Sequence, residues 1–110
     1  NQFHFISKSN DLLSYGWSSN SRKFFVSEIE NYLDNKYGII FFDFVTLESF
    51  QNKGYYKSLL CLMLGNFRSK NCFIYSLSSN KKSISAILST GFIIMKKLLF
   101  FQKNSFTKIN

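Results

Sequence analysis

The chain has 110 residues, enough for one domain (1–110) built around one hydrophobic core. Hydrophobic residues make up 45% of it and aromatic residues 19%, a composition that excludes a disordered chain. Lys and Arg number 14 against 6 Asp and Glu, so the net charge of +8 attracts anions, whether a nucleic acid, an acidic protein, an anionic membrane or a phosphorylated cofactor.

The first third of the chain predicts a hairpin followed by a less regular segment. Phe3 and Phe5 alternate with polar residues, Asn10 and Asp11 mark a turn, and residues 12–18 form the returning strand. Residues 24–29 are interpreted as a strand, although residues 27–33 fit a helical turn equally well. Residues 34–38 are expected to form a loop.

The middle and the end of the chain predict strands that alternate with helices. Residues 39–47 are mostly apolar, as in a strand covered on both faces, and residues 73–77 repeat that character. A first helix is predicted from an apolar stripe whose residues recur at helical spacing: Tyr56, Leu59, Leu60, Met63 and Phe67. A second helix begins at Ser79 or Asn80, turns Ile84, Ile87 and Leu88 to one side, and ends at Gly91. Residues 92–102, interrupted by Lys96 and Lys97, predict one or two final strands. This order is typical of an α/β fold with a mixed sheet.

The cysteines, the apolar runs and the possible metal ligands indicate the cellular compartment of the protein. Cys61 lies in an apolar helical pattern and Cys72 opens an apolar strand, so we expect buried thiols without a disulfide. The apolar runs fall short of the ~20 residues of a transmembrane segment. No group of His, Cys, Asp and Glu has metal-ligand spacing, and the single histidine, His4, is interpreted as a packing residue. We therefore expect a cytoplasmic protein without a metal.

Two short motifs carry the functional prediction. Residues 51–56, Gln-Asn-Lys-Gly-Tyr-Tyr, join the strand to the first helix, where successive backbone N–H groups at the positive end of a helix suit a pyrophosphate. Residues 80–83, Asn-Lys-Lys-Ser, open the second helix, which closes at Gly91-Phe92. Each motif has a simpler explanation, because a glycine turn is common before a helix and Asn is a favoured N-cap.

Taken together, the two motifs resemble the GNAT superfamily of acyl-CoA-dependent N-acyltransferases over about residues 38–101. That family has an Arg/Gln-x-x-Gly-x-Gly/Ala turn, matched here by Gln51, Gly54 and Tyr56, and then an Asn-x-x-Ser/Ala cap and a Gly-Phe pair. The resemblance implies a mixed, mostly antiparallel central sheet with two helices. It also implies that the chain starts near the family's second strand, so the acceptor site is open or is completed by a second copy, another partner or further segments.

The resemblance further implies acetyl-CoA, or another acyl-CoA, as co-substrate and an amine as acceptor. The implied cofactor-binding residues are Val45, Thr46, Leu47, Gln51, Asn52, Lys53, Gly54, Tyr55, Tyr56, Asn80 and Ser83. The backbone at 45–47 would align the thioester, and one N–H there would stabilise the oxyanion. Lys53, Lys57, Lys81 and Lys82 would attract the phosphates.

Two positions depart from the family pattern. Tyr56 replaces the last small residue of the turn, and Ile87 stands where the family often has a tyrosine that acts as general acid. For the general base that deprotonates the amine, the sequence offers Glu48 first, then Asp43 and Glu28. Two alternatives stay open: a non-catalytic module of this fold that binds CoA or a partner and, less favoured, a basic nucleic-acid-binding module.

Overall fold

The structure is a computed structural model that describes residues 1–35 and 38–94, together with the backbone of 98–102 and 105–109. The strands are β1 (Gln2–Lys8), β2 (Asp11–Ser19), β3 (Lys23–Val26), β4 (Asn31–Asp34), β5 (Gly38–Thr46), β6 (Asn71–Ile74), β7 (Leu98–Gln102) and β8 (Ser105–Ile109). The helices are α1 (Tyr55–Asn66) and α2 (Lys81–Ser89), with short 3-10 turns at η1 (Ser27–Ile29) and η2 (Glu48–Phe50).

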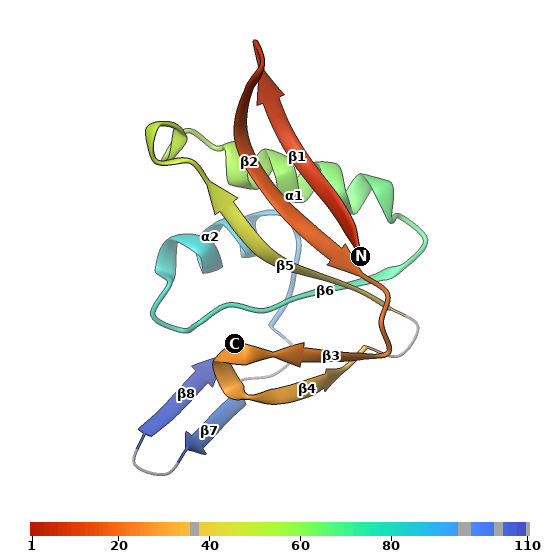
Figure 1. Cartoon of the computed structure of the whole chain (residues 1–110), viewed down its shortest axis with the longest axis vertical. Coiled ribbons are helices and arrows are strands. Elements are labelled where there is room, and N and C mark those ends of the chain that lie inside the picture. The colour runs from red at the N-terminus through yellow and green to blue at the C-terminus, as the bar shows by residue number, and fades with distance from the viewer. Residues whose placement is uncertain (36–37, 95–97, 103–104, 110) are drawn as a thin grey trace.

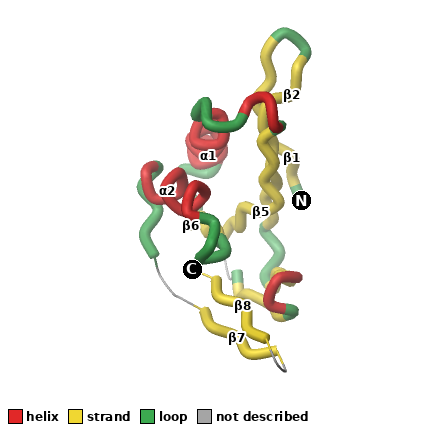
Figure 2. Tube along the Cα trace, turned by 90° about the vertical axis from the view of Figure 1, so that its left-hand side faces the viewer, coloured by secondary structure: helices red, strands yellow, loops and turns green. Residues whose placement is uncertain are grey.

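The central sheet has the strand order β1-β2-β5-β6 (Figure 1). The pairs β1–β2 and β2–β5 are antiparallel, whereas β5 and β6 are parallel. Both helices lie on the same side of this sheet (Figure 2). The predicted mixed, mostly antiparallel sheet with two helices is therefore confirmed.

The predicted N-terminal hairpin is also confirmed. Ser9 and Asn10 join β1 to β2 with φ angles of 51° and 70°. Positive φ at both central residues is the requirement of the tight turns that match the twist of paired strands, and Asn tolerates that conformation well.

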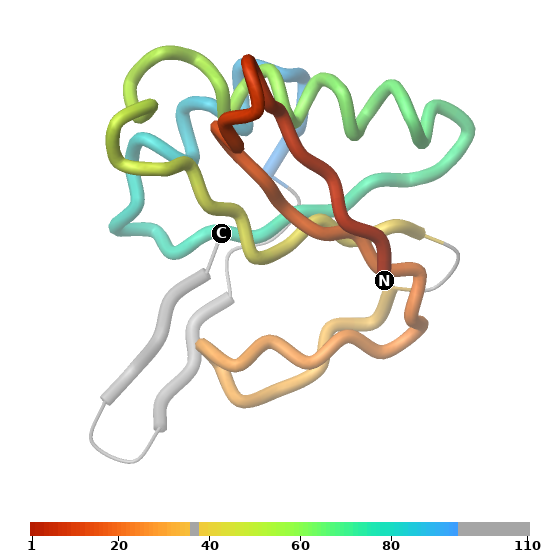
Figure 3. Tube along the Cα trace, turned by 45° about the horizontal axis from the view of Figure 1, so that its top comes forward, coloured from red at the N-terminus to blue at the C-terminus, as the bar shows by residue number. Residues whose placement is uncertain are grey.

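The segment after the hairpin differs from the prediction. The strand expected over residues 24–29 ends at Val26, and η1 and then β4 follow it. β3 and β4 form a separate two-stranded sheet, which Figures 1 and 3 place apart from the helices, beyond β5 and β6. Burial explains the break, because the turn at η1 lets Val26 and Ile29 enter one small apolar cluster together.

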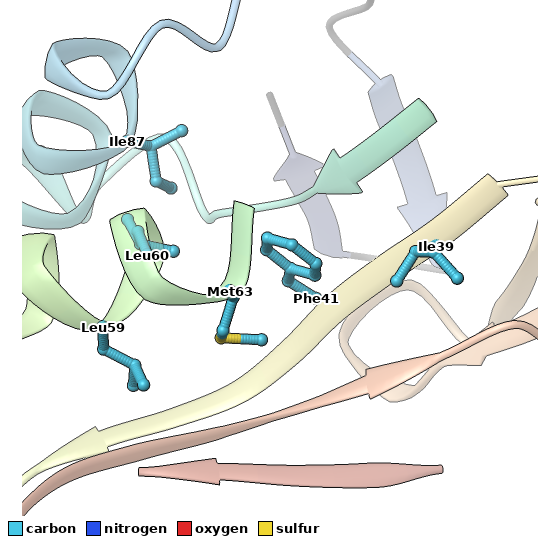
Figure 4. Close-up of a cluster of buried hydrophobic side chains, with 6 residues drawn as sticks. All are labelled: Ile39, Phe41, Leu59, Leu60, Met63 and Ile87. Atoms are coloured by element: carbon cyan, nitrogen blue, oxygen red, sulfur yellow. The ribbon is translucent and has the colours of Figure 1, made fainter. Parts of the chain in front are cut away.

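The main core lies between α1, α2 and the sheet (Figure 4). Leu59, Leu60 and Met63 of α1 are fully buried and pack with Ile39 and Phe41 of β5. Each such side chain contributes roughly 1.5–3 kcal/mol on burial. The predicted apolar stripe of the first helix is therefore confirmed, with Tyr56 and Phe67 half-buried at its ends.

Other predictions need correction. Only the first four residues of β5 are buried, and the rest alternate between half-buried and exposed because β6 does not extend beside them. β6 starts at Asn71 and stops at Ile74, so it does not reach residue 77. Of the two cysteines, Cys61 is exposed and Cys72 is half-buried, so the expected full burial is wrong.

The C-terminal prediction is met in part. Residues 92–94 form no strand, residues 95–97 with Lys96 and Lys97 lie outside the described residues, and β7 begins at Leu98. β7 pairs antiparallel with β8, a strand that the sequence analysis did not anticipate. Residues 36–37 of the predicted loop also lie outside the described residues.

Candidate functional site

A cleft of about 710 Å³ opens where β5 and β6 part. The two strands pair from Gly38–Asn71 to Phe41–Ile74, and beyond that point β5 forms one wall of the cleft and residues 75–77 form the other. The turn before α1 and the first half of α2 complete it. This volume lies in the range of about 300–1,000 Å³ typical of small-molecule sites.

A bulge in β5 shapes the first wall. Tyr15 and Trp17 of β2 pair with Val45 and Phe42, so three steps on β5 match two on β2. Asp43 takes up the extra residue with a φ of 54°, and its side chain reaches the cleft. Such bulges re-aim side chains next to functional sites.

Gly16 of β2 lies next to Phe44 of β5, a residue that lines the cleft. A Cβ on Gly16 would lie 2.5 Å from the Phe44 ring, so only glycine lets that ring lie against β2. Phe44 is therefore fixed between the sheet and the cleft.

One end of the cleft combines a helix N-terminus with lysine side chains. Gly54 is the N-cap of α1 with a φ of 81°, and no described side chain caps this helix. The N–H groups of its first turn therefore have no intrahelical partner, and they stand at the positive end of the helix dipole. Lys57 and Lys82 line the same end, and Lys82 Nζ donates a hydrogen bond to Asn52 Oδ1 at 3.1 Å.

Gln51 and Lys53 have different contacts in the turn before α1. Gln51 Nε2 donates to the backbone oxygen of Thr46 at 3.1 Å, which ties the turn to the end of β5. Lys53 Nζ lies 6.0 Å from the centre of the Phe50 ring and does not line the cleft. Figure 3 shows this turn and the start of α2 on the same side of the molecule.

Asn80 caps α2 as the sequence predicts. Its Oδ1 accepts a hydrogen bond from the backbone N–H of Ser83 at 3.2 Å. Asn80 also lines the cleft. The contact of Asn80 with the acyl-CoA, which the resemblance implies, stays a prediction.

Tyr56 lines the cleft and contacts two of its walls. Its hydroxyl lies 3.2 Å from Ser83 Oγ. Its ring lies edge-on to the Phe44 ring, with 5.2 Å between the two ring centres. Burial raises the pKa of Tyr56, and the Ser83 hydrogen bond acts in the opposite direction. The phenol is therefore protonated at neutral pH, with a hydroxyl partner beside it. Ile87, one turn after Ser83, packs in the core instead.

The other end of the cleft is acidic and aromatic. Glu28 of η1, Asp43 of β5 and Tyr75 all line it. The pKa of Tyr75 is strongly raised, first by burial and then by the negative charges of Glu28 and Asp43. Two carboxylates from distant parts of the sequence thus lie close enough to Tyr75 to act on its phenol.

The structure brings together most of the predicted site residues. Those that line the cleft are Glu28, Asp43, Thr46, Gln51, Asn52, Gly54, Tyr55, Tyr56, Asn80 and Ser83. Val45, Leu47, Glu48 and Lys53 do not line it, and Glu48, the first choice for the base, is exposed on η2. Seven further lining residues were not predicted from the sequence: Phe42, Phe44, Phe50, Tyr75, Ser76, Leu77 and Ala86. The apolar character of 39–47 and 73–77 suggested only burial, and nothing local indicated where the two strands part.

Comparison with solved structures identifies the fold. The chain superposes on yncA from Salmonella typhimurium, a putative acetyltransferase with its cofactor acetyl-CoA, with a TM-score of 0.70 and 17% sequence identity over 93% of this chain. It also superposes on PH1933 from Pyrococcus horikoshii OT3 with a TM-score of 0.57 and 12% identity over 94% of this chain. The chain spans 57% and 59% of the length of those two proteins. Its fold is GNAT-like, as the motifs implied.

Sequence comparisons add no closer relative. No family model and no curated protein matches the chain. Within the described residues, no helix has the length and apolar character needed to cross a membrane. Nor do three or more His, Cys, Asp or Glu side chains meet there as metal ligands would.

Proposed function

We propose that the protein is an acyl-CoA-dependent N-acyltransferase, most simply an N-acetyltransferase that moves the acetyl group directly from acetyl-CoA to an amine in the cytoplasm. The observation that carries the proposal is the two-ended cleft in a GNAT-like fold. Its lysine-bearing end lies at an uncapped helix N-terminus, and its other end holds two carboxylates.

The anionic end of the donor fits the residues present. The first-turn N–H groups of α1 offer donors to a diphosphate, and a Cβ on Gly54 would meet nothing within 4 Å, so the approach is open. Lys57 and Lys82 add positive charge. When bound, acetyl-CoA supplies a reactive thioester.

The second step is the deprotonation of the acceptor. An ammonium group cannot attack a carbonyl, so a base must take its proton. We assign this role to Asp43 or Glu28, which line the cleft, ahead of Glu48, which does not. The backbone of residues 45–47 would orient the acyl group, and this alignment supplies much of the acceleration. The acceptor end is open or is completed by a second copy, another partner or further segments of the protein.

The proposal is tested by incubating the protein with acetyl-CoA and a panel of amines: spermidine, glucosamine, tyramine and a lysine-containing peptide. We expect release of the CoA thiol together with an acetylated amine detected by mass spectrometry. Release of thiol at the same rate without any amine, or no acetylated product from any of them, contradicts the proposal.

A non-catalytic module that binds CoA is the second candidate. The observation in its favour is Ile87, which packs in the core where the family often has a proton donor. Saturable binding of acetyl-CoA without transfer to any amine on the panel would favour this candidate. A steep loss of affinity for DNA with added salt, without CoA binding, would instead favour nucleic-acid binding.

A further inference from the structure

Acyl transfer from a thioester leaves a thiolate, and this group must gain a proton before the thiol product departs. Ile87 cannot supply one. The described residues of the cleft include three phenols, Tyr55, Tyr56 and Tyr75, and their surroundings separate their roles.

Tyr55 and Tyr75 are poorly placed to donate to the sulfur. Tyr55 lies at the turn before α1, and the centre of its ring is 6.2 Å from the centre of the Phe50 ring. Tyr75 lies at the opposite end, near Glu28 and Asp43, whose negative charges oppose loss of its proton. Tyr55 is therefore at the end proposed to bind the phosphates, and Tyr75 is at the end proposed to bind the amine.

Tyr56 instead packs its ring against Phe44 of β5 and directs its hydroxyl to α2. Its hydroxyl is 3.2 Å from Ser83 Oγ, so a phenolate formed there is stabilised by the serine hydroxyl. Ser83 precedes Ile87 by one helical turn, and helical side chains lean toward the N-terminus of their helix. The hydroxyl of Tyr56 therefore reaches the part of α2 toward which a phenol at position 87 would lean, although it comes from α1.

We propose that Tyr56 is a catalytic residue that protonates the departing thiolate, with Ser83 as its partner. The assignment rests on the proposed acyltransferase function. The carboxylate takes a proton from the ammonium group, and the free amine nitrogen then forms the C–N bond with the thioester carbon. The nitrogen loses its second proton to water, and the carboxylic acid returns its proton to solvent. The C–S bond then breaks with its electron pair moving to sulfur, which takes the proton of Tyr56. The phenolate recovers a proton from Ser83, and Ser83 recovers one from water.

The first test measures kcat and KM for acetyl-CoA in the parent and in Tyr56→Phe. Phenylalanine keeps the ring against Phe44 and removes only the hydroxyl. We expect kcat to fall about 10²-fold, as is typical on loss of a general acid, with little change in KM. Tyr32→Phe is the matched control, because Tyr32 is 60% exposed on β4, and we expect it to keep the parent values.

The second test does not depend on turnover. The pKa of the thiol of bound CoA is read from the ultraviolet absorbance of its thiolate. A hydrogen bond from Tyr56 stabilises the thiolate, so this pKa should be about one to two pH units lower in the parent than in Tyr56→Phe. Desulfo-CoA, which lacks the sulfur, should bind both proteins equally.

The outcomes separate the two proposals. A parent protein that acetylates none of the amines overturns the acyltransferase function. A parent that transfers acetyl, with a Tyr56→Phe variant that matches it in kcat and in the pKa of the bound thiol, overturns the role of Tyr56 alone. So does a Tyr56→Ala variant that binds acetyl-CoA more tightly and keeps the parent kcat, because the ring would then only narrow the cleft.

Discussion

Replacing Gly54 by aspartate and by asparagine separates charge from shape at the predicted diphosphate site. Gly54 is exposed, has a φ of 81°, and has open space where a Cβ would stand. Both side chains therefore fit without a clash, and both bear the same cost of the left-handed conformation, about 1 kcal/mol. Asn and Asp tolerate this region better than other non-glycine residues. The two variants then differ by one negative charge.

That charge sets the size of the effect. Because Gly54 is exposed, the appropriate medium is close to water. A carboxylate about 5 Å from each of two phosphate charges is repelled by about 0.8 kcal/mol per charge, or ~1.7 kcal/mol in total. This energy corresponds to a loss of affinity of roughly 15- to 20-fold. The separation is shorter than the Debye length of about 10 Å at 0.1 M salt, so the effect persists at moderate ionic strength and shrinks at 1 M.

Calorimetric titration with acetyl-CoA measures the difference, with circular dichroism to verify that both variants are folded. We expect Gly54→Asn to bind nearly as the parent does and Gly54→Asp to bind roughly 15- to 20-fold more weakly than Gly54→Asn. Equal dissociation constants for the two folded variants would refute the diphosphate site at the start of α1.

Three further predictions concern the cap, the buried histidine and the base. Asn80→Ser should lower the free energy of unfolding by only a few tenths of a kcal/mol, and Asn80→Ala by about 1 kcal/mol; both should bind acetyl-CoA more weakly, and unchanged affinity in Asn80→Ser would leave the residue only its capping role. Burial lowers the pKa of His4, whose Nε2 lies 2.8 Å from Ser18 Oγ, so the unfolded chain binds more protons than the folded one below about pH 6.5. The free energy of unfolding, from urea titrations, should therefore fall as the pH drops through this range and level off below the folded pKa; an identical pH dependence in His4→Gln would show that another group is responsible. Asp43→Asn or Glu28→Gln should lower the transfer rate by ~10²–10⁴-fold at neutral pH and by less in alkali, where the amine is already deprotonated; Glu48→Gln serves as the comparison, and a larger loss in it than in the other two would restore Glu48 as the base.

Local chemistry was sufficient to predict the elements that frame the lysine-bearing end of the cleft. The turn at Gly54 and the cap at Asn80 depend on backbone conformations that few residues favour, so their sequence signals are specific. The apolar stripe of α1 is long enough for its period to be recognised. Each of these signals depends on residues that are close together in the sequence, so it can be recognised without knowledge of the fold.

The acidic end of the cleft could not be predicted in this way. Tyr75 belongs to an apolar run that indicated only a buried strand, and Glu28 stood in a segment that fitted strand and helix equally. Their proximity arises because β6 ends at Ile74 while β5 continues through its bulge at Asp43. Which strand ends first is decided by packing between distant segments. The break after Val26 likewise depends on the joint burial of Val26 and Ile29.

The central claim is tested most directly by titrating the parent protein with acetyl-CoA in a calorimeter at physiological ionic strength. We expect saturable binding with one site per chain, and competition by adenosine 3′,5′-bisphosphate, which carries the 3′-phosphate end of the donor. Absence of saturable binding, or binding that the bisphosphate leaves unchanged, would contradict the assignment of the cleft to an acyl-CoA.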